Sequence, residues 1–204
     1  MKAIPLFPLN AVLFPCGQLA LQVFEVRYLD MIKKCIAGGQ EFGVVSLLQG
    51  SEVRKPGQAE TLARVGTMAR VDEWSAPLPA LLHVSCVGTA RFAIVAAEQL
   101  KHGLWMAQAA PIAADLVLPI PPELQNVANA LGAVIRTLQQ SRIVPAQMPV
   151  PAPFRLDECG WVANRWCELL ALGQEQKQRL LEQENPVLRL ELISDVLAEN
   201  GWLE

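Results

Sequence analysis

Apolar and polar residues alternate along the first half of the chain in the manner of β-strands. The opening apolar run, residues 4–15, is cut by three prolines into short extended pieces, so it cannot form one helix. Further strand-like segments are predicted at residues 18–23, 41–48, 61–74, 81–100 and 104–112. Six or so strands with a single early helix favour a compact, partly closed β-barrel.

One helix interrupts these strands and is predicted over residues 26–37. Its apolar side chains recur at spacings of three and four, which places five of them on one face: Tyr28, Leu29, Ile32, Cys35 and Ile36. The Gly38-Gly39 pair that follows can adopt the left-handed conformation that ends a helix. The pattern therefore predicts an amphipathic helix that stops at the glycine pair.

The hydrophobic period changes from that of strands to that of helices across the prolines at 111–122. Helices are predicted from 124 to 138, after Asp157, from 174 to 183, and from Asn185-Pro186, a capping residue followed by proline at the first helical position. The residues of the last helix expected to face inward are Leu188, Leu192, Ile193 and Val196. Trp161, Trp166 and Trp202 are expected to be core or packing residues. We therefore predict an α+β protein with a β-rich domain at 1–118 and an α-helical domain at 119–204.

The composition favours an apolar contact surface over a charged one. Hydrophobic residues make up 52% of the chain, charged residues 18%, and the formal net charge is −3. A chain with this balance has no overall basic field to attract nucleic acid or anionic lipid. No apolar run approaches the roughly 20 residues of a membrane span. A nucleic-acid partner and a membrane location are both disfavoured.

The five cysteines point to a reducing compartment. Their number is odd and no two form a CxxC pair, so buried reduced thiols are favoured over a disulfide framework. Lys2 and the apolar run after it imitate a signal peptide, and Cys16 imitates a lipoprotein cleavage site. The interrupting prolines, and Pro15 directly before Cys16, argue against both. We predict a cytoplasmic protein.

The usual motifs of catalysis are missing from the sequence. There is no GxxxxGK[ST] loop, no GxSxG elbow and no HExxH pair. His83 and Cys86 are three residues apart in a strand-like run, so alternation places them on opposite faces and disfavours a nucleophile pair. Asp72-Glu73 lacks a third metal ligand and is typical of a solvated turn. We predict no catalytic residue, no cofactor, no metal site and no enzyme activity.

Two features remain as candidate sites. Glu25 and Arg27 share a strand-to-helix junction, where a structural ion pair or a cap on the helix is favoured over acid–base work. Residues 74–80 are predicted to form a proline-rich turn that carries Trp74 and Leu78. This turn is either an exposed contact patch for a peptide or a hydrophobic lid that packs back on the barrel.

The order of motifs along the chain resembles the N-terminal domain family of Lon protease. The matching segments are Leu6-Phe7-Pro8-Leu9, Leu13-Phe14-Pro15, Phe24-Glu25, Arg27-Tyr28 and Phe42-Gly43-Val44-Val45, then Gly66-Thr67-Met68-Ala69, Gly88-Thr89-Ala90-Arg91-Phe92 and the helical residues from Leu169 to Leu190. The resemblance covers nearly the whole chain. One departure is Asn10-Ala11, which stands where many relatives have a Pro-Gly pair.

The resemblance implies a fold and a function. The expected fold is a PUA-like β pseudo-barrel followed by a C-terminal helical bundle. The expected function is that of a non-catalytic, stand-alone module that binds unfolded or apolar polypeptide, without the ATPase and protease domains of full-length relatives. Phe24, Glu25, Arg27 and Tyr28 would then form a structural motif. RNA binding is the alternative, which the PUA-like fold alone suggests.

Overall fold

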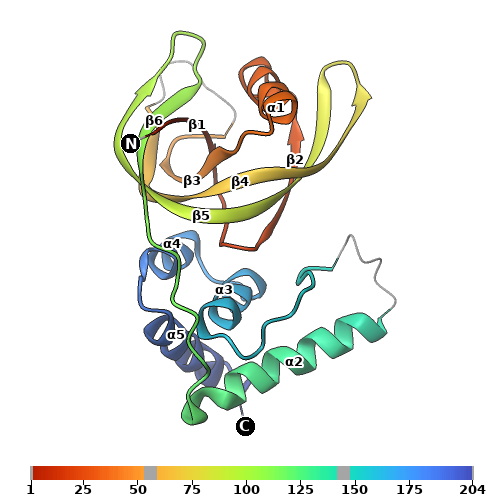
Figure 1. The fold of residues 1–204 in the computed structure, drawn as a ribbon, viewed down its shortest axis with the longest axis vertical. Helices are drawn as coiled ribbons and strands as arrows, with labels where there is room; N and C mark the ends of the chain where they lie inside the picture. Colours follow the sequence, from red (N-terminus) through yellow and green to blue (C-terminus); the bar gives the residue numbers. More distant parts are fainter. Residues whose placement is uncertain (1, 53–58, 142–147, 204) are drawn as a thin grey trace. The chain divides into compact units, whose positions relative to one another are not determined.

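The computed structural model describes residues 2–52, 59–141 and 148–203. The chain divides into two compact units, Met1–Ala114 and Asp115–Glu204 (Figure 1). The division lies four residues before the predicted boundary. Among the described residues, no helix is both long and apolar enough to cross a membrane.

The first unit contains every named strand and one α-helix. Its elements are β1 (Lys2–Leu9), β2 (Gln18–Val23), α1 (Val26–Gly38), β3 (Phe42–Gln49), β4 (Thr61–Leu78), β5 (Leu81–Gln99) and β6 (Trp105–Pro111). The second unit is helical and contains a short 3-10 helix, η1 (Pro122–Leu124), then α2 (Gln125–Gln140), α3 (Cys159–Leu169), α4 (Gln174–Glu182) and α5 (Pro186–Glu199). The α+β class, with a β-rich barrel before a helical region, is confirmed.

The strands close into a ring because the long strand β5 pairs with three others. The order is β2-β5-β4-β3-β1-β6, and β6 also pairs with β5, which joins the two ends of the five-stranded part. β1 and β3 are parallel, and the remaining pairs are antiparallel. β2 lies outside the ring, on the first half of β5. The hairpin of β4 and β5, drawn in yellow, extends beyond the ring (Figure 1).

Helix α1 packs its apolar face into the main core of the barrel. Tyr28, Leu29, Ile32 and Cys35 of the predicted stripe are buried there, and Ile36 is partly buried. The helix ends as expected, because Gly39 adopts a left-handed φ of 59° and its N–H reaches the last turn. A second core cluster, which includes Leu6, Val45 and Phe92, lies on another side of the sheet.

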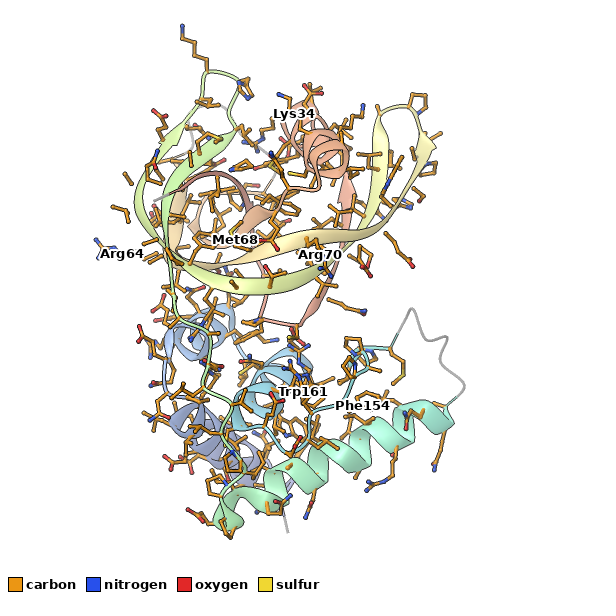
Figure 2. The ribbon with its side chains drawn as sticks, in the orientation of Figure 1. Lys34, Arg64, Met68, Arg70, Phe154 and Trp161 are labelled. Atoms are coloured by element: carbon orange, nitrogen blue, oxygen red, sulfur yellow. The ribbon has the colours of Figure 1, made fainter. Side chains whose placement is uncertain are left out.

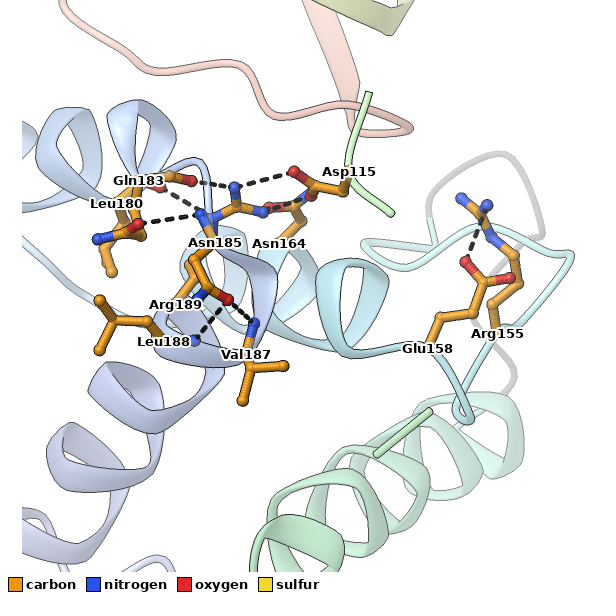
Figure 3. A network of polar contacts seen from close by, with 10 residues as sticks. All are labelled: Asp115, Arg155, Glu158, Asn164, Leu180, Gln183, Asn185, Val187, Leu188 and Arg189. Atoms are coloured by element: carbon orange, nitrogen blue, oxygen red, sulfur yellow. Dashed lines mark hydrogen bonds and ion pairs between the residues drawn. The ribbon is translucent and has the colours of Figure 1, made fainter. Parts of the chain in front are cut away.

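The second unit is built around α3 and a buried arginine. All residues from Cys159 to Cys167 are buried. Arg189 of α5 lies among them with 1% of its side chain exposed, and its guanidinium contacts Asp115, Asn164 and the carbonyl groups of Leu180 and Gln183 (Figure 3). Asn185 caps α5 as predicted, because its Oδ1 accepts hydrogen bonds from the next turn.

The prediction of the inward-facing residues of α5 is wrong in part, although Ile193 is buried as expected. The buried face of α5 consists of Pro186, Arg189, Leu190, Ile193 and Leu197. Leu188 and Leu192 are therefore not core residues, with exposed fractions of 39% and 42%. Trp161 and Trp166 are buried as expected, whereas Trp202 is exposed and is a packing residue, with its ring centroid 6.1 Å from that of Trp166.

Candidate functional site

The Phe24–Tyr28 junction joins β2 to α1 and is organised by Arg27. The Arg27 side chain is 5% exposed and pairs with Glu25 across 3.1 Å. It also donates hydrogen bonds to the carbonyl oxygens of Gly103, at 2.7 Å, and Glu52, at 3.4 Å. Glu25 stands at the N-cap position, but its side chain makes no capping hydrogen bond, so the cap alternative is wrong. The geometry at this junction is that of an ion pair.

Tyr28 extends this arrangement into the core. Its ring stacks on Phe7 with 4.1 Å between centroids, and the Arg27 guanidinium lies 4.4 Å from the ring centre. Burial raises the pKa of the Tyr28 hydroxyl above its ordinary value, so the group is neutral at physiological pH. Arg27 therefore connects α1 to residues far away in the sequence through hydrogen bonds. Tyr28 packs next to it in the core.

Removing the carboxylate of Glu25 is expected to destabilise the first unit modestly. In Glu25→Ala, Arg27 loses the one carboxylate that it pairs with among the described residues. It keeps two carbonyl acceptors. The expected loss is about 1 kcal/mol in the free energy of unfolding, which urea denaturation would measure. Lys33→Ala is the control, because Lys33 is an exposed residue of the same helix. An unchanged unfolding midpoint together with altered ligand binding would contradict the structural role.

A large apolar hollow opens on one side of this junction, between α1 and β6. We call it the α1–β6 hollow. Its cavity volume is about 530 Å³, and its apolar lining includes Val26, Met31, Leu100, Leu104 and Met106. Asp30, Lys34 and His102 also line it. Lys34 is labelled on α1 in Figure 2. Val26 is 73% exposed and forms part of the wall, although it lies off the predicted apolar stripe.

Two further hollows border β2. The first, called the β2 hollow, has a volume of about 310 Å³ and is lined by Phe7, Leu9, Ala11, the residues from Leu19 to Glu25, Tyr28 and Glu52. The second, called the Trp74 hollow, has a volume of about 450 Å³ and is lined by Ala20–Gln22, Glu73–Ser75 and His83–Ser85. Each contains one exposed aromatic side chain: Phe24 is 56% exposed and Trp74 is 54% exposed.

The structure corrects the predicted turn at 74–80. β4 continues through Leu78, and only Pro79 and Ala80 form the turn before β5. A register shift also separates Trp74 from Leu78. Trp74 pairs with Val84 of β5, and Leu78 pairs with Leu81 of β5. Val84 and Leu81 are separated by an odd number of positions along the strand. Because alternate residues of a strand face opposite sides, the two side chains lie on opposite faces of the hairpin. They are both exposed but do not form one patch.

The titratable groups of the described residues form no metal cluster and no reactive cysteine pair. No group of three or more potential metal ligands occurs in the part of the chain that the structure describes. Cys86 is fully buried, and burial raises the pKa of its thiol to about 12, so the nucleophilic thiolate is scarce at neutral pH. His83 is exposed on the other side of β5.

Sequence reasoning treated Phe24 as part of a motif and missed that its side chain is exposed beside a hollow. A signal was present: Phe24 and Val26 are apolar residues that flank Glu25 and do not belong to the buried stripe of α1. The hollows themselves could not be foreseen, because their walls come from separate elements and from Glu52. Exposed aromatic residues beside apolar hollows are the features of a binding module.

Comparison with known families identifies which kind of binding module this is. The substrate-binding domain of ATP-dependent protease La (LON) matches residues 3–199. The chain therefore belongs to the LON substrate-binding domain family, as its motifs indicated. A comparison with curated proteins gave no match.

Solved structures agree with this assignment. The chain is similar to a Lon N-terminal domain protein from Xanthomonas campestris, with 28% identity, a TM-score of 0.75, and coverage of 96% of this chain and 98% of the other. The fold is also that of the N-terminal domain of the Mycobacterium avium complex Lon protease. There the identity is 14%, the TM-score is 0.63, and 95% of this chain and 97% of the other are covered. The family model that matches residues 3–199 describes a substrate-binding domain.

Proposed function

We propose that this protein is a non-catalytic module that binds unfolded or apolar polypeptide segments. The observation that carries the proposal is that the β2 hollow and the Trp74 hollow share Ala20, Leu21 and Gln22, and that each hollow has a half-exposed aromatic side chain. We call Phe24, Trp74 and these two hollows the β2 surface. Membership of a substrate-binding family supports a binding role for it.

The chemistry of the β2 surface suits an apolar chain. Aromatic side chains contribute large contact areas at a small cost in conformational entropy, and they dominate many binding interfaces. Phe24 and Trp74 are half exposed, so an apolar residue placed on either one would remove its ring from water. Hydrophobic transfer is non-directional, which allows one surface to accept different apolar sequences.

No observation favours the RNA alternative. Among the described residues, neither hollow that borders β2 is lined by lysine or arginine, while Glu52 and Glu73 contribute carboxylates. Phosphate groups would meet a repulsive field there.

All five cysteines lie within the described residues and are free thiols, which supports placing the protein in the cytoplasm.

Trp74→Ala is expected to weaken the capture of unfolded polypeptide about tenfold, because a half-exposed aromatic anchor is lost. The measurement is fluorescence anisotropy with a labelled, reduced and carboxymethylated polypeptide. Circular dichroism and thermal melting should be unchanged, because Trp74 lies outside the buried core.

The matched control is Val95→Ala, since Val95 is a similarly exposed apolar residue on β5 that lines none of the three hollows. It should bind as wild type does. Equal binding by Trp74→Ala and wild type would refute the role of Trp74. Much earlier melting of Trp74→Ala would show that the tryptophan is a packing residue, as the lid alternative holds.

A nucleic-acid shift assay at low and high salt tests the RNA alternative.

A further inference from the structure

Strand β2 has a free edge. It pairs with β5 through Gln18–Val87 to Val23–Leu82 and, among the described residues, pairs with no other strand. Ala20 and Gln22 are exposed. An edge of this kind presents a row of backbone N–H and C=O groups that can pair with another extended chain.

The hydrogen bonds at the start of β2 show which residues point outward. Gly88 donates its N–H to the carbonyl of Gly17 at 2.8 Å, so residue 17 bonds to β5. In an antiparallel pair, such bonded positions alternate with positions whose backbone groups point away. Leu19, Leu21 and Val23 therefore bond to β5, and the N–H and C=O of Ala20 and Gln22 point to the free edge.

The sequence of β2 does nothing to block this edge. Strand edges are usually protected by charged side chains, by proline or by a bulge. β2 reads Gln-Leu-Ala-Leu-Gln-Val, with neither charge nor proline, and its pairing with β5 shows no register shift. The β2 hollow is lined by β2 from Leu19 onward and by the exposed ring of Phe24 that follows the strand.

The charges around this edge indicate the chemistry of an occupant. The carboxylate of Glu25 is paired with Arg27, but Glu52 adds negative charge to the β2 hollow. Glu73 adds negative charge to the Trp74 hollow, which is lined by β2, β5 and β4. His83 is the one basic side chain that lines either hollow in the described part of the protein. A chain that carries lysine or arginine beside its apolar residues complements this field.

We propose that an extended, apolar and net-positive polypeptide segment adds to the free edge of β2 as a further strand. Its backbone pairs with Ala20 and Gln22, one apolar side chain enters the β2 hollow against Phe24, and a basic residue lies near Glu52, within the negative field to which Glu73 also contributes. The proposal rests on the proposed function and specifies the binding mode and the charge of the bound segment.

The first test removes one outward N–H group. In Ala20→Pro the lost N–H is not part of the β2–β5 ladder, and an edge strand tolerates proline at such a position. The probe is a labelled ten-residue peptide of leucine, valine and three lysines. We expect at least tenfold weaker binding than wild type, with circular dichroism and melting unchanged. Ala113→Pro, at an exposed residue near the end of the first unit, is the control and should bind as wild type.

The second test uses wild-type protein and does not depend on the folding of a variant. Two versions of the peptide carry backbone N-methyl groups on alternate residues, one in each register. Strand addition predicts that one version loses at least tenfold in affinity and the other binds nearly as well as the parent, because only one set of amides faces β2. A peptide in which glutamates replace the lysines should bind at least tenfold more weakly at low salt.

Each outcome has a separate meaning. If wild type binds neither the peptide nor unfolded polypeptide, the proposed function fails. If it binds them, but both methylated versions bind like the parent, binding occurs without strand addition and this inference alone is overturned. If sedimentation shows that wild type self-associates and Ala20→Pro does not, the occupant of the edge is a second copy, and the inference is again overturned.

Discussion

Replacing Arg189 with methionine is expected to lower the free energy of unfolding of the second unit by about 3–5 kcal/mol, the cost of breaking a buried ion pair. Arg189 pairs with Asp115 across 2.6 Å, and only 1% of the arginine side chain and 17% of the aspartate side chain are exposed. Its Nε donates to Leu180 at 3.0 Å, and its guanidinium also donates to Asn164 and Gln183 (Figure 3). Methionine fills similar space but leaves the Asp115 carboxylate and several acceptors without this donor.

Hydrogen exchange with mass spectrometry would measure this effect, because it reports each unit separately. Amides of α3 and α5 should exchange much faster in Arg189→Met, whereas those of the barrel should keep their wild-type rates. Arg179→Ala is the matched control: Arg179 pairs with Glu175, but both side chains are more than 70% exposed, so the expected change is at most about 0.5 kcal/mol. Similar protection in the Arg189 and Arg179 variants would show that the buried network contributes little.

The same network explains why the buried face of α5 was predicted wrongly. A hydrophobic pattern treats arginine as an outward-facing residue, so the residues expected to face inward were Leu188, Leu192, Ile193 and Val196, of which Ile193 is buried. The partners that allow Arg189 to be buried are side chains and carbonyl groups from other segments, and Asp115 is 74 residues away. Gly160 leaves room for that carboxylate, since a Cβ at this position would lie 2.7 Å from Asp115 Oδ2. Such long-range compensation leaves no periodic signal in the sequence.

Local features of the fold could be predicted because local physics decides them. The change from strand to helix period, the glycine pair after α1 and the Asn185-Pro186 start of α5 all act within a few residues. Closure of the ring depends instead on β5, which pairs with β4 through residues 81–93, with β2 through 82–87 and with β6 through 92–99. The length of the run at 81–100 predicted a long strand but could not indicate its partners.

The candidate site was only partly predictable for the same reason. Trp74 and Leu78 were chosen as apolar residues in a proline-rich segment, and both are exposed. The prolines, however, do not end β4 early, and the register shift between Ser75 and Leu78 places the two side chains on opposite faces. Neither the hollows on β2 nor the free edge has a signature in one segment, because each is defined by what the neighbouring elements leave uncovered.

Gly88→Ala is expected to destabilise the barrel by about 2–3 kcal/mol, toward the upper end of the usual cost of adding a methyl group to a packed site. A Cβ at Gly88 would overlap the carbonyl oxygen of Phe14 and would lie 3.1 Å from the Cγ of Leu13. The obstacle is backbone, which cannot rotate away. The segment is also held in place by hydrogen bonds, because Gly88 donates to Gly17 and accepts from Cys16, both at 2.8 Å, and Thr67 Oγ1 donates to Leu13 at 2.6 Å.

The control for this change is Gly38→Ala, where the same methyl group should have the opposite effect. A Cβ at Gly38 would meet only the flexible side chain of Gln40, at an ordinary 3.4 Å. Alanine is favoured over glycine within a helix by about 0.5–1 kcal/mol, so this variant should be neutral or slightly more stable. Urea denaturation followed by far-ultraviolet circular dichroism gives both values, and hydrogen exchange should locate the loss at residues 13–17 and β2. If Gly88→Ala unfolds at the wild-type midpoint, the chain before β2 can move aside, and its close approach to β5 is not required for the fold.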